Sequence, residues 1–425
     1  MKKTLIAVAA AAALTATSAF AEITFGAWLR VIASPVASTG EDIIAGVQNS
    51  WGWGARTARI NINGTSEDGK AGFVMGVYND FESGLGQGDD AYLWVKPVDT
   101  VKVSVGKFDS PTNGLRGDFT YGSWNWLRPG NWLYDGEGLT FDGIWRSGLM
   151  VEADPMDGLH AFAVIPMSAS YKSAEEVYRN IQVGFGYAIE GVGKLKAQFI
   201  GDYSYSTKNT TDTEYYLNTA TGDIDEKDVT VTGKKDEDAT TGQIGVAFDI
   251  TAIENLYVTV GARFGIADKD VVAKTRDDGN YLKMAFTAGA SYQVSETMKF
   301  SVDGGYKQFQ NKFNADDDSL FSVGAGVDFT VMDGLAAVAD VRYMSNMYGK
   351  LGDEGAISFL VGVNKSVSSN GSLGIGFQGA TNGCGFNWDN RSKGIISGKS
   401  FTAGEADGDG DQFVWAIPVS VSVWF

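Results

Sequence analysis

The residues of this chain that could do chemistry are charged side chains placed among apolar ones. Five arginines lie in or beside segments where every second residue is apolar: Arg30, Arg56, Arg59, Arg263 and Arg342. Five aspartates are placed in the same way: Asp202, Asp249, Asp303, Asp328 and Asp340. Fixed charges of both signs on one surface act on ions through electrostatics, without covalent chemistry. The pattern favours a charged, water-contacting wall over a catalytic centre.

Signals for covalent catalysis are weak. The chain has one histidine, His160, which follows a short turn predicted at 154–158. Its apolar neighbours Leu159 and Ala161 put His160 on the polar face of a strand, where we expect a structural or water-exposed role. The sequence holds no H-E-x-x-H motif and no P-loop. We interpret the single cysteine, Cys384, as a free loop thiol, and we predict no enzymatic activity, no cofactor and no metal.

Segments with a period of two residues position these charges. From Phe413 to Phe425 every odd residue is apolar, and Ser420 and Ser422 fall on the other face. Since successive side chains of a strand point to opposite faces, one face stays apolar up to the last residue. The same alternation recurs at residues 23–31, 181–187, 256–264, 321–330 and 357–364.

An apolar strand at a chain end invites aggregation in water. A membrane barrel requires such strands, because lipid covers their apolar face and barrel closure pairs their backbone. Beyond residue 21 no run of 18 apolar residues occurs, which excludes a helical membrane protein. Short connections such as 97–100 and 191–193 alternate with long ones at 34–49, 110–137, 207–239, 266–279 and 380–411. We therefore predict an all-β, transmembrane antiparallel β-barrel of about 18 strands, with 16 as the alternative, short periplasmic turns and long extracellular loops.

The N-terminal segment indicates export. Residues 1–21 combine Lys2 and Lys3, an apolar run and the A-x-A site that ends at Ala21, so we predict a signal peptide at 1–21 and a barrel domain at 22–425. The sequence pI near 4.5 argues against a nucleic-acid partner.

The strand that ends at Phe425 resembles the C-terminal strand of bacterial outer-membrane barrels, and the chain resembles the Gram-negative general porins. The resemblance implies a water-filled channel for passive diffusion of small hydrophilic solutes and ions across the bacterial outer membrane. It also implies contact with outer-membrane lipid, recognition of the terminal strand by the barrel-assembly machinery, and a homotrimer.

Segment 110–137 has the position of the third loop of general porins, which folds into the barrel. The resemblance implies a pore constriction between the wall arginines and the charged residues of this loop: Arg116, Asp118, Arg128, Asp135 and Glu137. The acidic-plus-glycine motif of the best-known porins is absent from the loop. If the excess of acidic over basic residues in the chain extends into the lumen, the channel should have a mild preference for cations.

Two other functions stay open from the sequence. Trp124, Trp126 and Trp132 would stack against sugar rings in a carbohydrate-selective channel, or would pack the loop against the wall. Alternatively, the long loops would bind a partner at the cell surface, as in an adhesin or receptor.

Overall fold

The computed structural model describes residues 22–38, 43–48, 58–80, 84–110, 115, 144–169, 171, 173–217, 224–266, 280–311, 318–345, 355–381 and 413–425. Most of these residues lie in strands, which follow one another in this order: β1 (Glu22–Ser38), β2 (Ile43–Gln48), β3 (Ala58–Thr65), β4 (Ala71–Asp80), β5 (Gly84–Val98), β6 (Val101–Ser110), β7 (Ile144–Met156), β8 (Leu159–Pro166), β9 (Gln182–Ile189), β10 (Gly193–Leu217), β11 (Ile224–Ile250), β12 (Leu256–Gly265), β13 (Asn280–Ser295), β14 (Met298–Asn311), β15 (Asp318–Met332), β16 (Leu335–Met344), β17 (Ala356–Ser368), β18 (Gly371–Ala380), β19 (Val414–Ala416) and β20 (Val419–Trp424). A short helix, α2 (Ala174–Tyr178), lies between β8 and β9.

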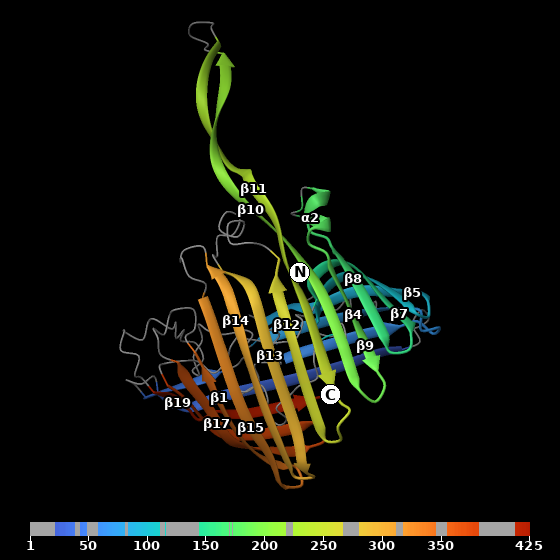
Figure 1. Ribbon diagram of the computed structural model, residues 1–425, viewed down its shortest axis with the longest axis vertical. Coiled ribbons are helices and arrows are strands. Elements are labelled where there is room, and N and C mark those ends of the chain that lie inside the picture. Colours follow the sequence, from blue (N-terminus) through green and yellow to red (C-terminus); the bar gives the residue numbers. More distant parts are fainter. Residues whose placement is uncertain are drawn as a thin grey trace.

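The strands close into one antiparallel barrel (Figure 1). From β3 to β18 each strand pairs with the next one along the chain, and β1 pairs with both β3 and β20. β2 pairs with the end of β1, and β19 and β20 are two parts of one closing strand, so the described residues form an 18-strand barrel. The prediction of about 18 strands is confirmed, and the alternative of 16 is wrong. Of the helices in the described part of the chain, none is long and apolar enough to cross a membrane.

Pro418 divides the closing strand. Proline has no backbone N–H to donate to a neighbouring strand, and the strand is interrupted between Ala416 and Val419. The Pro418 carbonyl still accepts from the Gly376 N–H at 3.0 Å. Backbone hydrogen bonds also hold the chain end: Phe425 and Ala27 each donate an N–H to the carbonyl of the other, at 2.8 and 3.0 Å.

Short turns join the strands at one end of the barrel, which we call the short-turn end. In the turn between β3 and β4, the Ser66 hydroxyl and the Lys70 N–H donate to one carboxylate oxygen of Asp68, at 2.6 and 3.0 Å. These hydrogen bonds lower the pKa of Asp68, because they favour its ionised form. Gly69 completes the turn with a φ of 66°, a conformation that glycine adopts at little cost.

The two faces of the barrel wall differ as the alternation predicts. On β15, Phe321, Val323, Phe329 and Val331 are exposed, whereas Ser322 between them is buried. The ten steps from Phe321 to Val331 cover about 33 Å along the strand and, at a tilt of about 40°, about 25 Å across the membrane. That height matches the apolar band of a membrane barrel, so these side chains face lipid.

Lipid contact predicts a depth-dependent cost for a charge on this face. Val341 lies near the middle of the band, opposite Ala325, and Val331 lies at the short-turn edge; each is 46% exposed. Val341→Arg should lower the free energy of unfolding in lipid vesicles by about 2–4 kcal/mol, and Val331→Arg by about 0–1 kcal/mol. Denaturant titration of both variants measures this. Equal costs at the two positions would contradict the assignment of this face to lipid.

A two-stranded ribbon extends the barrel at its other end. β10 pairs with β9 up to Ile200, and β11 pairs with β12 from Gln243, but β10 and β11 pair with each other as far as Leu217 and Ile224. Figure 1 shows this ribbon rising far beyond the other strands. The predicted long connection over 207–239 lies on this side of the barrel, and the structure shows that most of that segment forms the ribbon. The sequence did not reveal it because a ribbon outside the barrel packs neither face on lipid, so its residues lack apolar alternation.

Candidate functional site: the charged inner wall

The site is the inner wall, which comprises the residues of the barrel strands that alternate with the lipid-facing ones. The structure places Arg30, Arg59, Arg263 and Arg342 on this wall, together with Asp249, Asp303 and Asp340. Each of the four arginines lies six to eight residues from the short-turn end of its strand. Arg30 and Arg59 are on the paired strands β1 and β3, whereas Arg263 and Arg342 are on β12 and β16. The four form a belt at a similar height above the short-turn end rather than one basic patch.

Arg59 is held by two residues on the two strands beyond β3. Its Nη2 donates to Oδ2 of Asp90 at 3.0 Å, and its Nη1 donates to the Tyr78 hydroxyl at 2.9 Å. Its guanidinium carbon lies 5.2 Å from the centre of the Tyr78 ring, within the range of a cation–π contact. The charge of Arg59 is therefore neutralised at the wall.

Arg342 makes a similar contact on the other side of the barrel. Its Nη2 donates to both carboxylate oxygens of Asp303, at 2.5 and 2.6 Å, and its Nη1 donates to the Ser322 hydroxyl. The side chains of Arg342 and Asp303 are 2% and 0% exposed. A buried, charge-assisted contact of this kind is strong, and the two nitrogens of the guanidinium bind two different partners, which fixes its position.

Arg263 and Arg30 contact neutral groups. Nη2 of Arg263 donates to the side-chain carbonyl of Gln243 on β11. The guanidinium carbon of Arg30 lies 5.8 Å from the centre of the Trp28 ring. Sequence reasoning found these two arginines but missed Gln243 and Trp28, because the contacts depend on the strand register.

Two lysine pairs on the inner wall were missed by the sequence interpretation. Nζ of Lys196 lies 2.6 Å from Oδ2 of Asp249, whose other oxygen accepts from Thr259 at 2.8 Å; both charged side chains are at least 95% buried. Nζ of Lys102 lies 2.5 Å from Glu152, and this pair is partly exposed. The alternation rule could have found Lys196, which lies between the outward-facing Leu195 and Ala197.

Leu115 lies against the inner wall. It is fully buried and packs in a cluster with Phe108, Met150, Phe162, Val164 and Ala247 from β6, β7, β8 and β11. A methyl group at Gly184 or Gly186 of β9 would lie 2.7 or 3.1 Å from its side chain. Among residues 111–137, Leu115 is the one that the structure describes.

The other predicted loop residues lie outside the described residues, as does Arg56. This applies to Arg116, Asp118, Arg128, Asp135 and Glu137, and to Trp124, Trp126 and Trp132. Their roles in a constriction or in sugar stacking stay predictions.

His160 lies near the short-turn end of the barrel. Its Nδ1 is 2.8 Å from Oδ1 of Asp154, and its Nε2 is 4.0 Å from Glu152. Within the described ranges, no group of three or more His, Cys, Asp or Glu residues is arranged to hold a metal ion.

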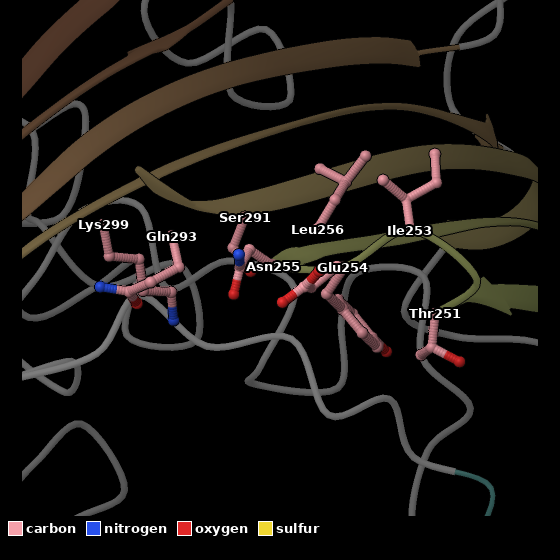
Figure 2. A pocket seen from close by; sticks show the side chains of 9 residues that line it. Thr251, Ile253, Glu254, Asn255, Leu256, Ser291, Gln293 and Lys299 are labelled. Carbon is pink, nitrogen blue, oxygen red and sulfur yellow. The ribbon is translucent and has the colours of Figure 1, made fainter. Parts of the chain in front are cut away.

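A polar pocket of about 360 Å³ lies at the short-turn end, away from the arginine belt. Figure 2 shows Glu254 and Asn255 of the β11–β12 turn between Gln293 and Lys299 on one side and Thr251 on the other. The full lining is Thr251, Ile253, Glu254, Asn255, Leu256, Tyr257, Ser291, Gln293 and Lys299.

Comparison with known proteins rests on solved structures. No protein-family model matches the chain, and no curated protein matches it significantly. The anion-selective porin from Comamonas acidovorans superposes with a TM-score of 0.51 at 15% identity, over 95% of this chain and 99% of that one. OmpT of Vibrio cholerae in its trimer form aligns at 13% identity and a TM-score of 0.47, over 95% and 99% of the two chains. A mutant of the Rh. blastica porin aligns at 16% identity and a TM-score of 0.43, over 95% and 100%. The Comamonas match and the closed 18-strand barrel show that this chain has the fold of the outer-membrane porins.

Proposed function

We propose that the protein is an outer-membrane porin, a water-filled channel for passive diffusion of small hydrophilic solutes and ions. The observation that carries the proposal is the contrast between the two faces of one closed wall. The outer face exposes apolar side chains over the height of a bilayer, and the inner face carries arginine, lysine, aspartate and serine. A wall that is apolar outside and charged inside suits a lumen that passes water and ions.

Planar-bilayer recording of the purified, detergent-solubilised protein tests this function. We expect stepwise conductance increases that scale with salt concentration, and liposome swelling in solutions of small sugars. A folded barrel that inserts into lipid but conducts no ions would contradict the channel and would favour a surface receptor.

We propose that segment 110–137 narrows the lumen. The support is Leu115, which is fully buried in a cluster of inner-wall residues from four strands and covers two glycines of β9. A segment anchored there starts from inside the barrel, so its charged residues Arg116, Asp118, Arg128, Asp135 and Glu137 are our candidates for the constriction.

Weak ion selectivity follows from the neutralised wall. Arg59, Arg342 and Lys196 each contact an aspartate, so their charges bias the lumen little, and the acidic balance of the chain should give a mild cation preference. A reversal potential under a KCl gradient measures this preference, and a clear preference for anions would contradict it.

We also propose that residues 1–21 are a signal peptide, that the strand ending at Phe425 is recognised by the assembly machinery, and that the barrel is a homotrimer. These proposals rest on the sequence pattern and on the resemblance to general porins. Chemical cross-linking in mild detergent should give a species of three chains, and a monomer at all protein concentrations would contradict the trimer.

A further inference from the structure

Two inner-wall ion pairs have a common construction, in which an arginine reaches across one strand to an aspartate on the next. Arg342 on β16 and Asp303 on β14 are separated by β15, and all three strands meet at Gly324, which is directly opposite both residues. Arg59 on β3 and Asp90 on β5 are separated by β4, which carries Gly76 beneath the guanidinium.

The spacing between the strands requires both guanidinium groups to lie flat on the wall. Strands two places apart in a sheet are about 9.5 Å from each other, so an arginine spans that gap only when its side chain runs along the wall instead of into the lumen. The room for this comes from the glycine of the intervening strand. A methyl group at Gly324 would lie 2.6 Å from Nη2 of Arg342, and one at Gly76 would lie 3.0 Å from Nη2 of Arg59.

We propose that Gly76 and Gly324 determine the ion selectivity of the lumen by letting these two arginines lie against the wall, where an aspartate neutralises them. This inference rests on the proposed channel function. With a side chain beneath it, the guanidinium would leave its aspartate and project toward the axis. The number of charges would stay the same, but the cation would then lie closer to a permeating ion than the aspartate does, and anions would be favoured.

The test is a graded series of three glycine-to-alanine variants of the full-length protein. Gly324→Ala creates the closest contact and should raise the chloride-to-potassium permeability ratio about two- to fivefold in dilute salt. Gly76→Ala creates a milder contact and should shift the ratio in the same direction by less. Gly26→Ala is the matched control: Gly26 pairs with Asn61 on β1 and β3, and its added methyl group would lie at an ordinary 3.5 Å from its nearest neighbour.

Reversal potentials in planar bilayers give the permeability ratios, and electrophoretic mobility before heating confirms that each barrel is folded. A Gly324→Ala channel with the wild-type ratio would overturn the inference while leaving the channel function intact. A wild-type protein without conductance would overturn the channel function itself. If Gly324→Ala does not fold, Arg342→Lys decides, because lysine keeps the charge but lacks the planar fork that binds Asp303 through Nη2 and Ser322 through Nη1. It should shift the ratio toward chloride, and an unchanged ratio would overturn the inference.

Discussion

Leu115→Ala should change the conductance of the channel if segment 110–137 narrows the lumen as proposed. Leu115 is completely buried among residues of four strands, and truncating such a leucine costs about 2–5 kcal/mol. If that energy holds the segment in place, the ratio of docked to undocked states falls by a factor of about 30 to several thousand. We expect larger mean single-channel conductance, more open-channel noise, and faster liposome swelling in larger sugars.

The control removes the same atoms from the other face of the wall. Leu93 on β5 is 67% exposed on the lipid-facing side, so Leu93→Ala should leave conductance and noise at their wild-type values. If Leu115→Ala destabilises the barrel and still conducts like the wild type, segment 110–137 does not narrow the lumen. The proposal of a constriction by Arg116, Asp118, Arg128, Asp135 and Glu137 would then be withdrawn.

Lys196→Met should strongly destabilise the barrel. It leaves the carboxylate of Asp249 buried with Thr259 as its remaining side-chain donor among the bonds described above. Loss of one member of a buried ion pair costs about 3–5 kcal/mol, because the other charge stays out of water without compensation. Denaturant titration in detergent, followed by circular dichroism, measures the loss.

Two further variants distinguish the effect of leaving one charge unpaired from the effect of losing the lysine side chain. The double variant Lys196→Met with Asp249→Leu removes both charges and should recover most of the lost stability. Lys102→Met breaks a pair whose lysine is 30% exposed and whose glutamate is 12% exposed, so its cost should be clearly smaller than that of Lys196→Met. Equal losses of stability for Lys196→Met and Lys102→Met would show that burial does not determine how much these pairs contribute to stability.

Part of the architecture was predictable because it follows from local periodicity. The alternation of apolar and polar residues places Val341 outside and Arg342 inside without knowledge of any partner strand, since neighbouring side chains of a strand point to opposite faces. Short turns such as 191–193 mark one end of the barrel, and their number leads to about 18 strands. The ribbon of β10 and β11 was missed because its residues have no apolar face to reveal a period of two.

The chain by itself indicated a barrel, through strands of alternating polarity that short and long connections join in turn. It also determined the lipid-facing side of the wall and the inward position of Arg30, Arg59, Arg263 and Arg342, because each of these depends on alternation within a single strand. Only the tertiary structure decided that Arg342 meets Asp303 across Gly324, and that Arg59 meets Asp90 across Gly76. Those contacts join three strands, and the register between strands is set by the whole closed sheet rather than by any one segment.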